Sequence, residues 1–240
     1  MTTQNPASFI SSRVVHLDQV SKTYHRTLVP VQALENIYLT IEKGEFTVLV
    51  GTSGCGKTTL LNLIGGLDRP SSGHIWVAGV QLNQLKDRQL INFRLHHIGF
   101  IFQSYNLIPV LTVWENIAFI MQLQKRPYRE IADRVETLLV KVGLINEQHR
   151  RPYQLSGGQQ QRVAIARALA ARPTLVLADE VTASVDSQTA SALIDLMLHL
   201  NQEENITFLL STHDDRVVNQ ARRVIRLEDG KVKSDEQQQV

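Results

Sequence analysis

The chain has 240 residues, of which 43% are apolar, so it is long enough for one large domain or for a domain with an inserted subdomain. Its 25 basic and 23 acidic residues leave a formal charge of +2, which gives no reason to expect nucleic acid or an anionic membrane surface as a partner. The single cysteine, Cys55, excludes an internal disulfide and fits a reducing cytosolic compartment.

The first 20 residues lack the basic start and the sustained apolar stretch of a secretory signal, so we expect the chain to stay in the cytoplasm. No window approaches the roughly 18 consecutive apolar residues that a membrane span needs. The nearest such window, 107–121, is interrupted by Pro109, Glu115 and Asn116. Any membrane span must therefore come from another protein.

Strand patterns dominate the first fifth of the chain. Short alternating segments at 14–17 and 33–41 predict strands of an N-terminal antiparallel portion, and the dense apolar run 46–50 predicts a buried central strand. The polar residues 1–13 and 232–240, at the two ends of the chain, predict flexible termini.

The segment GTSGCGKT at 51–58 follows the central strand and opens an apolar-periodic helix, which is the context that a phosphate loop requires. Backbone N–H groups of such a loop wrap the phosphates, the lysine reaches the terminal ones and the last hydroxyl holds magnesium. We therefore predict nucleotide binding by Gly51, Thr52, Ser53, Gly54, Cys55, Gly56, Lys57, Thr58 and Thr59. Cys55 is expected to be a small side chain in a tight turn, with an oxidant-sensitive site as the alternative.

After a predicted strand at 98–102, the pattern becomes helical at 112–124 and 129–142, where Pro127 and Gly143 are start and stop signals for the second helix. Strand patterns then resume and alternate with helices; these strands are at 175–178, 206–210 and 224–227.

The order of these elements predicts an α/β fold, with a P-loop NTPase core built on a mostly parallel sheet and an inserted α-helical subdomain. We assign residues 14–103 and 159–231 to the ATP-binding core and 104–158 to the helical subdomain.

A second glycine-rich segment, LSGGQ at 155–159, also opens a helix, where the positive N-terminus and the close backbone approach allowed by glycine favour phosphate. A domain with one nucleotide site has no evident use for a second phosphate-binding terminus. The best explanation is that this segment serves another copy of the protein.

Two carboxylates, Asp179 and Glu180, end the buried strand 175–178, and ligands bind at that edge of an open α/β sheet. Asp179 can hold Mg2+ beside the Thr58 hydroxyl, and Glu180 is then free to act as general base on a water molecule. His213, at the end of the next apolar strand, can sense or stabilise the terminal phosphate.

Together these residues resemble the nucleotide-binding subunit of ATP-binding-cassette (ABC) transporters over about 14–231. GTSGCGKT is similar to the Walker A loop of that family, Gln103 to its Q-loop residue, LSGGQ to its signature and LVLADE at 175–180 to its Walker B strand. Asp186 matches the D-loop and His213 the H-loop. Tyr24 matches the position where the family stacks an aromatic ring on adenine, and a core aromatic is the alternative.

The resemblance implies ATP and Mg2+ as cofactors, with Thr58, Gln103 and Asp179 at the metal and Lys57, Gln103, Glu180 and His213 in catalysis. It also implies a head-to-tail homodimer in which residues of one copy close over the ATP of the other; these are Ser156, Gly157, Gly158, Gln159 and Asp186. Hydrolysis then biases the dimer between open and closed arrangements.

The same resemblance implies a peripheral position on the inner face of the cell membrane, where a membrane permease subunit docks near the Q-loop and the helical subdomain. The segment 105–115 is expected to line much of that groove. For its apolar side chains the alternative is packing within the subdomain; they are Leu107, Ile108, Val110 and Leu111.

The stretches 60–73 and 102–117 are similar to the lipoprotein-releasing and macrolide-exporter branch of the family. One departure is Val181, where that branch has proline after the catalytic glutamate; this change frees the backbone and restores an N–H donor.

We therefore expect an ATPase that drives export or membrane extraction. A soluble nucleotide kinase is disfavoured by LSGGQ and the Q-loop. DNA-repair and translation cassettes are disfavoured because the chain has no long coiled coil, zinc module or second cassette, and a cell-division scaffold ATPase remains the alternative.

Overall fold

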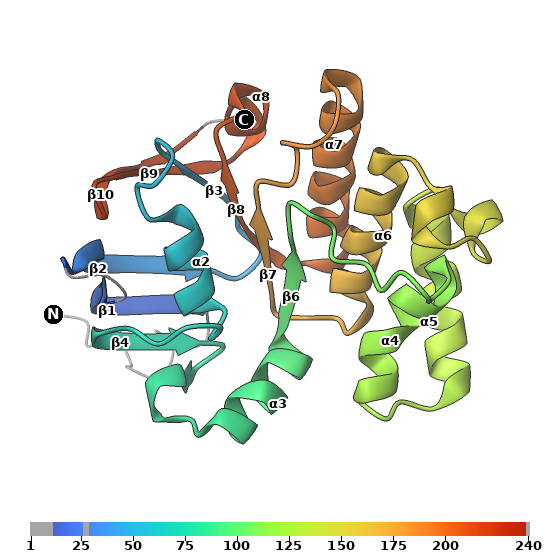
Figure 1. Cartoon of the computed structure of the whole chain (residues 1–240), viewed down its shortest axis with the longest axis horizontal. Helices are drawn as coiled ribbons and strands as arrows, with labels where there is room; N and C mark the ends of the chain where they lie inside the picture. The colour runs from blue at the N-terminus through green and yellow to red at the C-terminus, as the bar shows by residue number, and fades with distance from the viewer. Residues whose placement is uncertain (1–11, 26–28, 239–240) are drawn as a thin grey trace, which may run out of the picture.

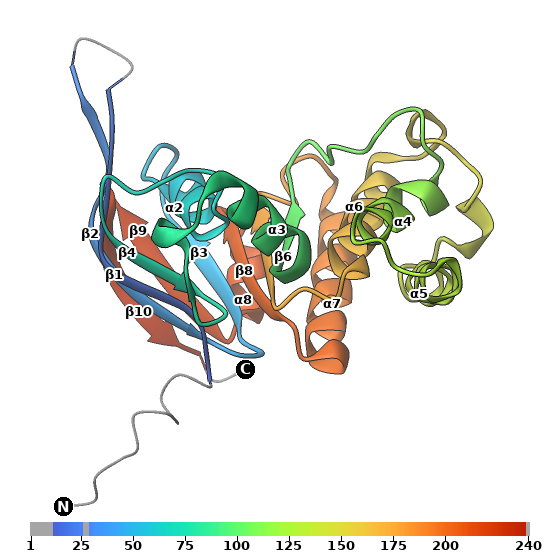
Figure 2. The ribbon, with the colours of Figure 1, turned by 90° about the horizontal axis from the view of Figure 1, so that it is seen from below.

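Two β-sheets organise the part of the chain that the computed structural model describes, residues 12–25 and 29–238 (Figure 1). The first is antiparallel, with strand order β2-β1-β4-β5. Its strands are β1 (Arg13–Tyr24), β2 (Val31–Glu42), β4 (Ser72–Val77) and β5 (Val80–Gln81). Figure 2 shows this sheet at one end of the molecule. It confirms the predicted antiparallel portion.

The second sheet has the order β10-β9-β3-β8-β7-β6 and is parallel except for β10. β3 (Phe46–Val50) and β8 (Thr207–Thr212) are buried at every residue, as expected for central parallel strands covered on both faces. The others are β6 (Ile98–Ile101), β7 (Leu175–Asp179), β9 (Arg223–Glu228) and β10 (Lys231–Gln237). The predicted mostly parallel sheet is confirmed.

Helices cover both faces of the parallel sheet. α2 (Lys57–Ile64) packs on the face that carries Leu49, whereas α6 (Gly157–Ala170) and α7 (Ser187–Glu204) pack on the face that carries Val48. The remaining helices are α3 (Asp87–His97), α4 (Val113–Leu123), α5 (Tyr128–Lys141) and α8 (Asp215–Gln220), with short 3-10 turns at Leu82–Gln84, Ile145–Glu147 and Pro152–Gln154. None of the helices in the described ranges has both the length and the apolar character of a membrane span.

The helices α4 and α5 form where the sequence predicts helices, at 112–124 and 129–142. α4 begins after Thr112, whose hydroxyl accepts a hydrogen bond from the Glu115 N–H in a capping box. α5 buries Ile131, Val135 and Leu138 at helical spacing. Both helices pack against α6, and α6 also packs against α7, so α6 joins the subdomain to the core.

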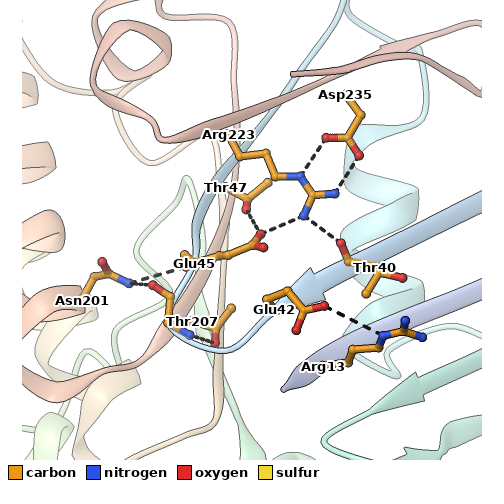
Figure 3. A network of polar contacts seen from close by, with 10 residues as sticks. Arg13, Thr40, Glu42, Glu45, Thr47, Asn201, Thr207, Arg223 and Asp235 are labelled. Carbon is orange, nitrogen blue, oxygen red and sulfur yellow. Dashed lines mark hydrogen bonds and ion pairs between the residues drawn. The ribbon is translucent and has the colours of Figure 1, made fainter. Parts of the chain in front are cut away.

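The prediction of a flexible C-terminal tail is wrong for residues 232–237, which belong to β10. Figure 3 shows the reason: the Arg223 guanidinium donates two hydrogen bonds of 2.7 Å to Asp235 and a further bond of 2.9 Å to Glu45. It also donates to the Thr40 carbonyl at 2.8 Å. These contacts join β9 to β10, β2 and the start of β3. Residues 1–11 and 239–240 lie outside the described residues.

A buried ion pair anchors the helical subdomain to the core. Arg134 of α5 donates hydrogen bonds of 2.9 and 2.6 Å to Glu204 of α7 and one of 2.8 Å to the Leu169 carbonyl of α6. Lys141 adds a bond of 2.9 Å to the same carboxylate. Burial raises the pKa of Glu204, but the bonds from Arg134 and Lys141 outweigh it and leave this pKa below its usual range.

We expect Arg134→Ala to lower the free energy of unfolding by about 3 kcal/mol, because the largely buried Glu204 carboxylate loses two of its hydrogen bonds and keeps only the one from Lys141. Urea unfolding measures this. The control, Arg126→Ala, removes an exposed ion pair with Glu130 and should cost less than about 0.5 kcal/mol. The contribution from Glu204 should be complete above its usual pKa of 4.5 and disappear as the pH falls through the folded value. Equal losses in the two variants would contradict the anchor.

Candidate functional site

The loop 51–56 connects β3 to α2 and depends on its glycines. A Cβ at Gly51 would collide with the Leu227 carbonyl of β9, and one at Gly56 would lie 2.6 Å from the Ala33 carbonyl of β2. Gly56 is also the N-cap of α2, with a φ of 107°. The carbonyls of two neighbouring strands therefore leave no room for a Cβ at these two positions of the loop, so both must be glycine. Cys55 is buried in this loop, in keeping with a small packed side chain.

Lys57 is the first residue of α2, and 6% of its surface is exposed. Its ammonium donates hydrogen bonds of 2.7 Å to the Gly51 carbonyl and 3.0 Å to the Thr52 carbonyl. Among the described residues, no side chain caps the N-terminus of α2 and no acidic residue occupies its first turn. The positive end of the helix and the lysine thus meet at a position suited to an anion.

Asp179 lies at the end of β7, where the sequence predicts it, and hydroxyls from two other elements hold it. Thr58 donates to one carboxylate oxygen at 2.9 Å, and the buried Ser211 of β8 donates to the other. In the described ranges, no group of three or more His, Cys, Asp or Glu side chains is placed to hold a metal. The pairing of one carboxylate with one hydroxyl nevertheless fits Mg2+, which takes few protein oxygens beside phosphates and water.

The structure brings Glu180 and His213 together across β7 and β8. The Glu180 Oε1 lies 3.5 Å from the His213 Nδ1, and the histidine side chain is 65% exposed. Glu180 has a φ of 47°, which is unusual for a residue with a Cβ, and its N–H donates to both the carbonyl and the hydroxyl of Ser211. Val181 follows as a buried side chain in the core. Ser211 therefore positions both acidic residues.

Gln103 lies in the exposed loop after β6, at the same edge of the sheet as Asp179, because β6 and β7 are parallel neighbours. The loop then turns through positive φ angles at Tyr105 and Asn106. Arg167 of α6 donates bonds of 2.8 and 2.6 Å to their two carbonyls. Burial lowers the pKa of Arg167. Sequence reasoning did not identify Arg167, which lies about 60 residues from the loop that it holds.

The expected apolar groove beyond Gln103 is only partly exposed. Val110 is 72% exposed, whereas Leu107 packs against the core. The buried Asn116 fixes this segment by bonds to the backbone of Ile108 and Leu111. Packing within the subdomain therefore accounts for Leu107, whereas Val110 is exposed and the predicted docking groove stays a prediction.

The LSGGQ segment starts α6, and Ser156 is its N-cap. The Ser156 hydroxyl accepts from the Gln159 N–H at 3.2 Å, and the Gln159 side chain accepts from the Ser156 N–H at 2.9 Å. A Cβ at Gly158 would lie 2.5 Å from a Thr189 methyl group, so this glycine also lets α7 approach. Because α2 and α6 cover opposite faces of the parallel sheet (Figure 1), the glycine-rich segments 51–58 and 155–159 of one chain lie on different sides of that sheet.

Asp186 caps α7 by accepting from the Gln188 and Thr189 N–H groups, each at 3.0 Å. The Thr189 hydroxyl donates a further bond of 2.7 Å and is the main cause of the lowered pKa of this carboxyl. Tyr24 ends β1 with its hydroxyl donating to Asp68 at 3.0 Å. It is only partly buried, so the core interpretation of this aromatic does not hold.

Comparison with known proteins agrees with this arrangement. A family model described as "ABC transporter" matches residues 34–183. The chain belongs to the ABC transporter family. As a member, it is an ATPase whose P-loop core carries a helical subdomain.

Similar proteins cover most of the chain. The lipoprotein-releasing system ATP-binding protein LolD 1 of Rhodopseudomonas palustris is 43% identical over 91% of this chain and 98% of its own. The macrolide export ATP-binding/permease protein MacB of Rhodopirellula baltica is 42% identical over 94% of this chain but 33% of its own. A dimeric, post-hydrolysis structure of the ATP-binding cassette MJ0796 bound to ADP and Pi, from Methanocaldococcus jannaschii, has a TM-score of 0.86 at 40% identity and covers 94% of this chain and 99% of that one.

We expect Ser211→Ala to lower kcat for ATP hydrolysis by about 10- to 100-fold, because Asp179 and the Glu180 backbone both lose a fixed partner. A steady-state phosphate-release assay measures this. Ser191→Ala is the matched control, since its hydroxyl bonds only to a carbonyl on the exposed face of α7. Unchanged hydrolysis in Ser211→Ala would show that Asp179 needs no such support.

Proposed function

We propose that this chain is the ATP-hydrolysing subunit of a membrane export or extraction complex and acts as a homodimer on a separate membrane permease. The observation that carries the proposal is the meeting of Thr58, Asp179 and Glu180 at one sheet edge, beside an uncapped phosphate-binding helix. This arrangement suits phosphoryl transfer to water, because such a reaction needs charge neutralisation and an oriented nucleophile more than covalent chemistry.

In this proposal the amides of the phosphate loop and Lys57 hold the ATP phosphates, and Tyr24 stacks on adenine. Thr58, Gln103 and Asp179 would hold Mg2+. The ion, when bound, neutralises charge on the transferring phosphoryl group. Glu180 takes a proton from the attacking water, and His213 orients toward the terminal phosphate while its ring stays within reach of Glu180.

The dimer explains the second glycine-rich segment. With α6 on the opposite face of the sheet from α2, LSGGQ is best used by the nucleotide of another copy. Ser156, Gly157, Gly158, Gln159 and Asp186 then face the partner's ATP. The dimeric state of the MJ0796 cassette supports this arrangement, since its chain is 40% identical to this one.

The membrane partner is inferred from relatives. LolD is named as part of a lipoprotein-releasing system, and MacB carries an ATP-binding part and a permease in one protein. We propose that a permease docks near the Q-loop and the helical subdomain, which places this chain at the inner face of the cell membrane. A cell-division scaffold is the alternative, and the identity of the co-purifying membrane protein separates the two.

We expect Glu180→Gln to retain ATP binding, to lower kcat by about 10²- to 10⁴-fold and to accumulate an ATP-bound dimer, because the base is lost while the phosphate contacts remain. Phosphate release and size-exclusion chromatography measure the two effects. Glu228→Gln, which removes the charge of an exposed carboxylate on β9 that pairs with Lys233, is the control. Near-normal turnover in Glu180→Gln would rule out this base.

We also expect a mixture of Lys57→Ala and Ser156→Arg proteins, both in a Glu180→Gln background, to form ATP-dependent mixed dimers. In such a dimer one phosphate loop and the facing LSGGQ are both intact. Each variant alone should stay monomeric, as measured with two differently tagged proteins. If both segments act within one chain, no dimer specific to the mixture will form.

A further inference from the structure

A cavity of about 680 Å3 lies beside the phosphate-binding helix and is not explained by the phosphate contacts. Its lining comes from the end of β1 and from the C-terminal part of α2 with the loop that follows; the residues are Lys22, Thr23, Tyr24, His25, Asn62, Leu67 and Asp68. Asn62 is five positions beyond Lys57, which corresponds to about 7 Å along a helix axis. The cavity is therefore bordered by the second turn of α2, next to the turn that begins at Lys57.

Asp68 joins the two walls of this cavity. One carboxylate oxygen accepts from the Lys22 ammonium at 2.7 Å and from the Arg69 N–H at 2.7 Å. The other oxygen accepts from the Tyr24 hydroxyl at 3.0 Å. Lys22 also donates to the Arg69 carbonyl at 2.7 Å, and its nitrogen lies 4.8 Å from the centre of the Tyr24 ring. Asp68 thus holds both Lys22 and Tyr24, and the two side chains also contact each other.

The backbone that carries this carboxylate is fixed to α2. The Leu67 and Asp68 N–H groups both donate to the Asn62 carbonyl, at 2.8 and 3.3 Å. Burial raises the pKa of Asp68, but the bonds from Lys22, the Arg69 N–H and Tyr24 outweigh it, so this pKa is below its usual range. Asp68 therefore remains charged at neutral pH and links the orientation of Tyr24 to the helix that receives phosphate.

We propose that Asp68 is a positioning residue for ATP: its carboxylate holds the Tyr24 ring in the orientation in which the ring stacks on adenine. A tyrosine at the end of a strand is free to rotate about two side-chain bonds, and stacking requires one orientation. The hydrogen bond at the phenol oxygen removes that freedom before the nucleotide arrives, which lowers the entropy cost of binding. The Lys22 ammonium lies over one face of the ring and is itself held by Asp68. The inference rests on the proposed use of ATP by this chain.

Calorimetric titration of the full chain with ATP and, separately, with inorganic tripolyphosphate tests the inference, because only ATP carries the base. Asp68→Ala should weaken ATP binding by about three- to tenfold and leave tripolyphosphate affinity unchanged. Tyr24→Phe, which keeps the ring but loses the hydroxyl, should act in the same direction. The double variant should bind ATP no more weakly than Asp68→Ala, since both changes break the same bond.

Two further variants separate positioning from general stability. Asp68→Asn keeps an acceptor for Tyr24 and should bind ATP nearly as the unmodified chain does. Asp87→Ala removes the exposed ion pair with Arg69 next to this site and should change neither affinity. Tyr24→Ala should weaken ATP binding by about tenfold or more, because the stacking surface itself is lost.

The inference is overturned if Asp68→Ala binds ATP like the unmodified chain, or if it weakens ATP and tripolyphosphate equally. Should Asp68→Ala fail to fold, Tyr24→Phe and Asp68→Asn decide, and unchanged ATP affinity in Tyr24→Phe counts against the inference. Failure of the proposed function looks different, because the unmodified chain then binds ATP but forms no ATP-dependent dimer. A chain that hydrolyses ATP but tolerates Tyr24→Ala refutes only this inference.

Discussion

The hydrogen bonds of Asp179 are the constraint on which the rest of the site depends. Its two oxygens are held by Thr58, at the start of α2, and by Ser211, at the end of β8. A single carboxylate thereby fixes the distance between the phosphate-binding helix and the strand that leads to His213. Ser211 also accepts hydrogen bonds from the Glu180 N–H, so the same residue holds the proposed metal ligand and the backbone of the proposed base.

Around this fixed centre, two arginine contacts of different strength help to attach the helical subdomain to the core. The buried contact of Arg134 with Glu204 holds the middle of α5 to the C-terminal end of α7, whereas Arg167 donates to the uncharged carbonyls of Tyr105 and Asn106. Bonds to a carboxylate are stronger than bonds to neutral carbonyls. The α5 anchor is therefore the stronger of these two contacts.

Sequence reasoning predicted the elements that form because of residues close together in the chain. The phosphate loop is recognisable because glycine is required at fixed spacing, and α4 and α5 because their apolar residues recur at helical spacing. β10 was mistaken for a flexible tail because Lys231–Gln237 is polar and its order comes from Arg223, distant in sequence. α3 was not predicted, since it buries only Leu90 and Phe93 and shows little periodicity.

The site also contains residues that a local pattern predicts and residues whose role depends on a partner distant in sequence. Asp179, Glu180 and His213 were predictable because parallel strands bring their carboxyl ends to one edge of the sheet. Ser211, Arg167 and Asp68 were not assigned a role, because each acts through a partner that only the fold brings near. Asp68, for example, is 44 residues from Tyr24 along the chain. Ordinary side-chain types give no sign of such partnerships in a single sequence.

Lys57 has a consequence for how the phosphate loop behaves between reaction cycles. Its ammonium bonds to the Gly51 and Thr52 carbonyls, so the lysine closes the loop on itself by contacts within the chain. In the proposed function, the Lys57 ammonium would exchange these carbonyls for phosphate oxygens of ATP. The conformational entropy of ordering the loop is lost once, during folding, and not again at each turnover.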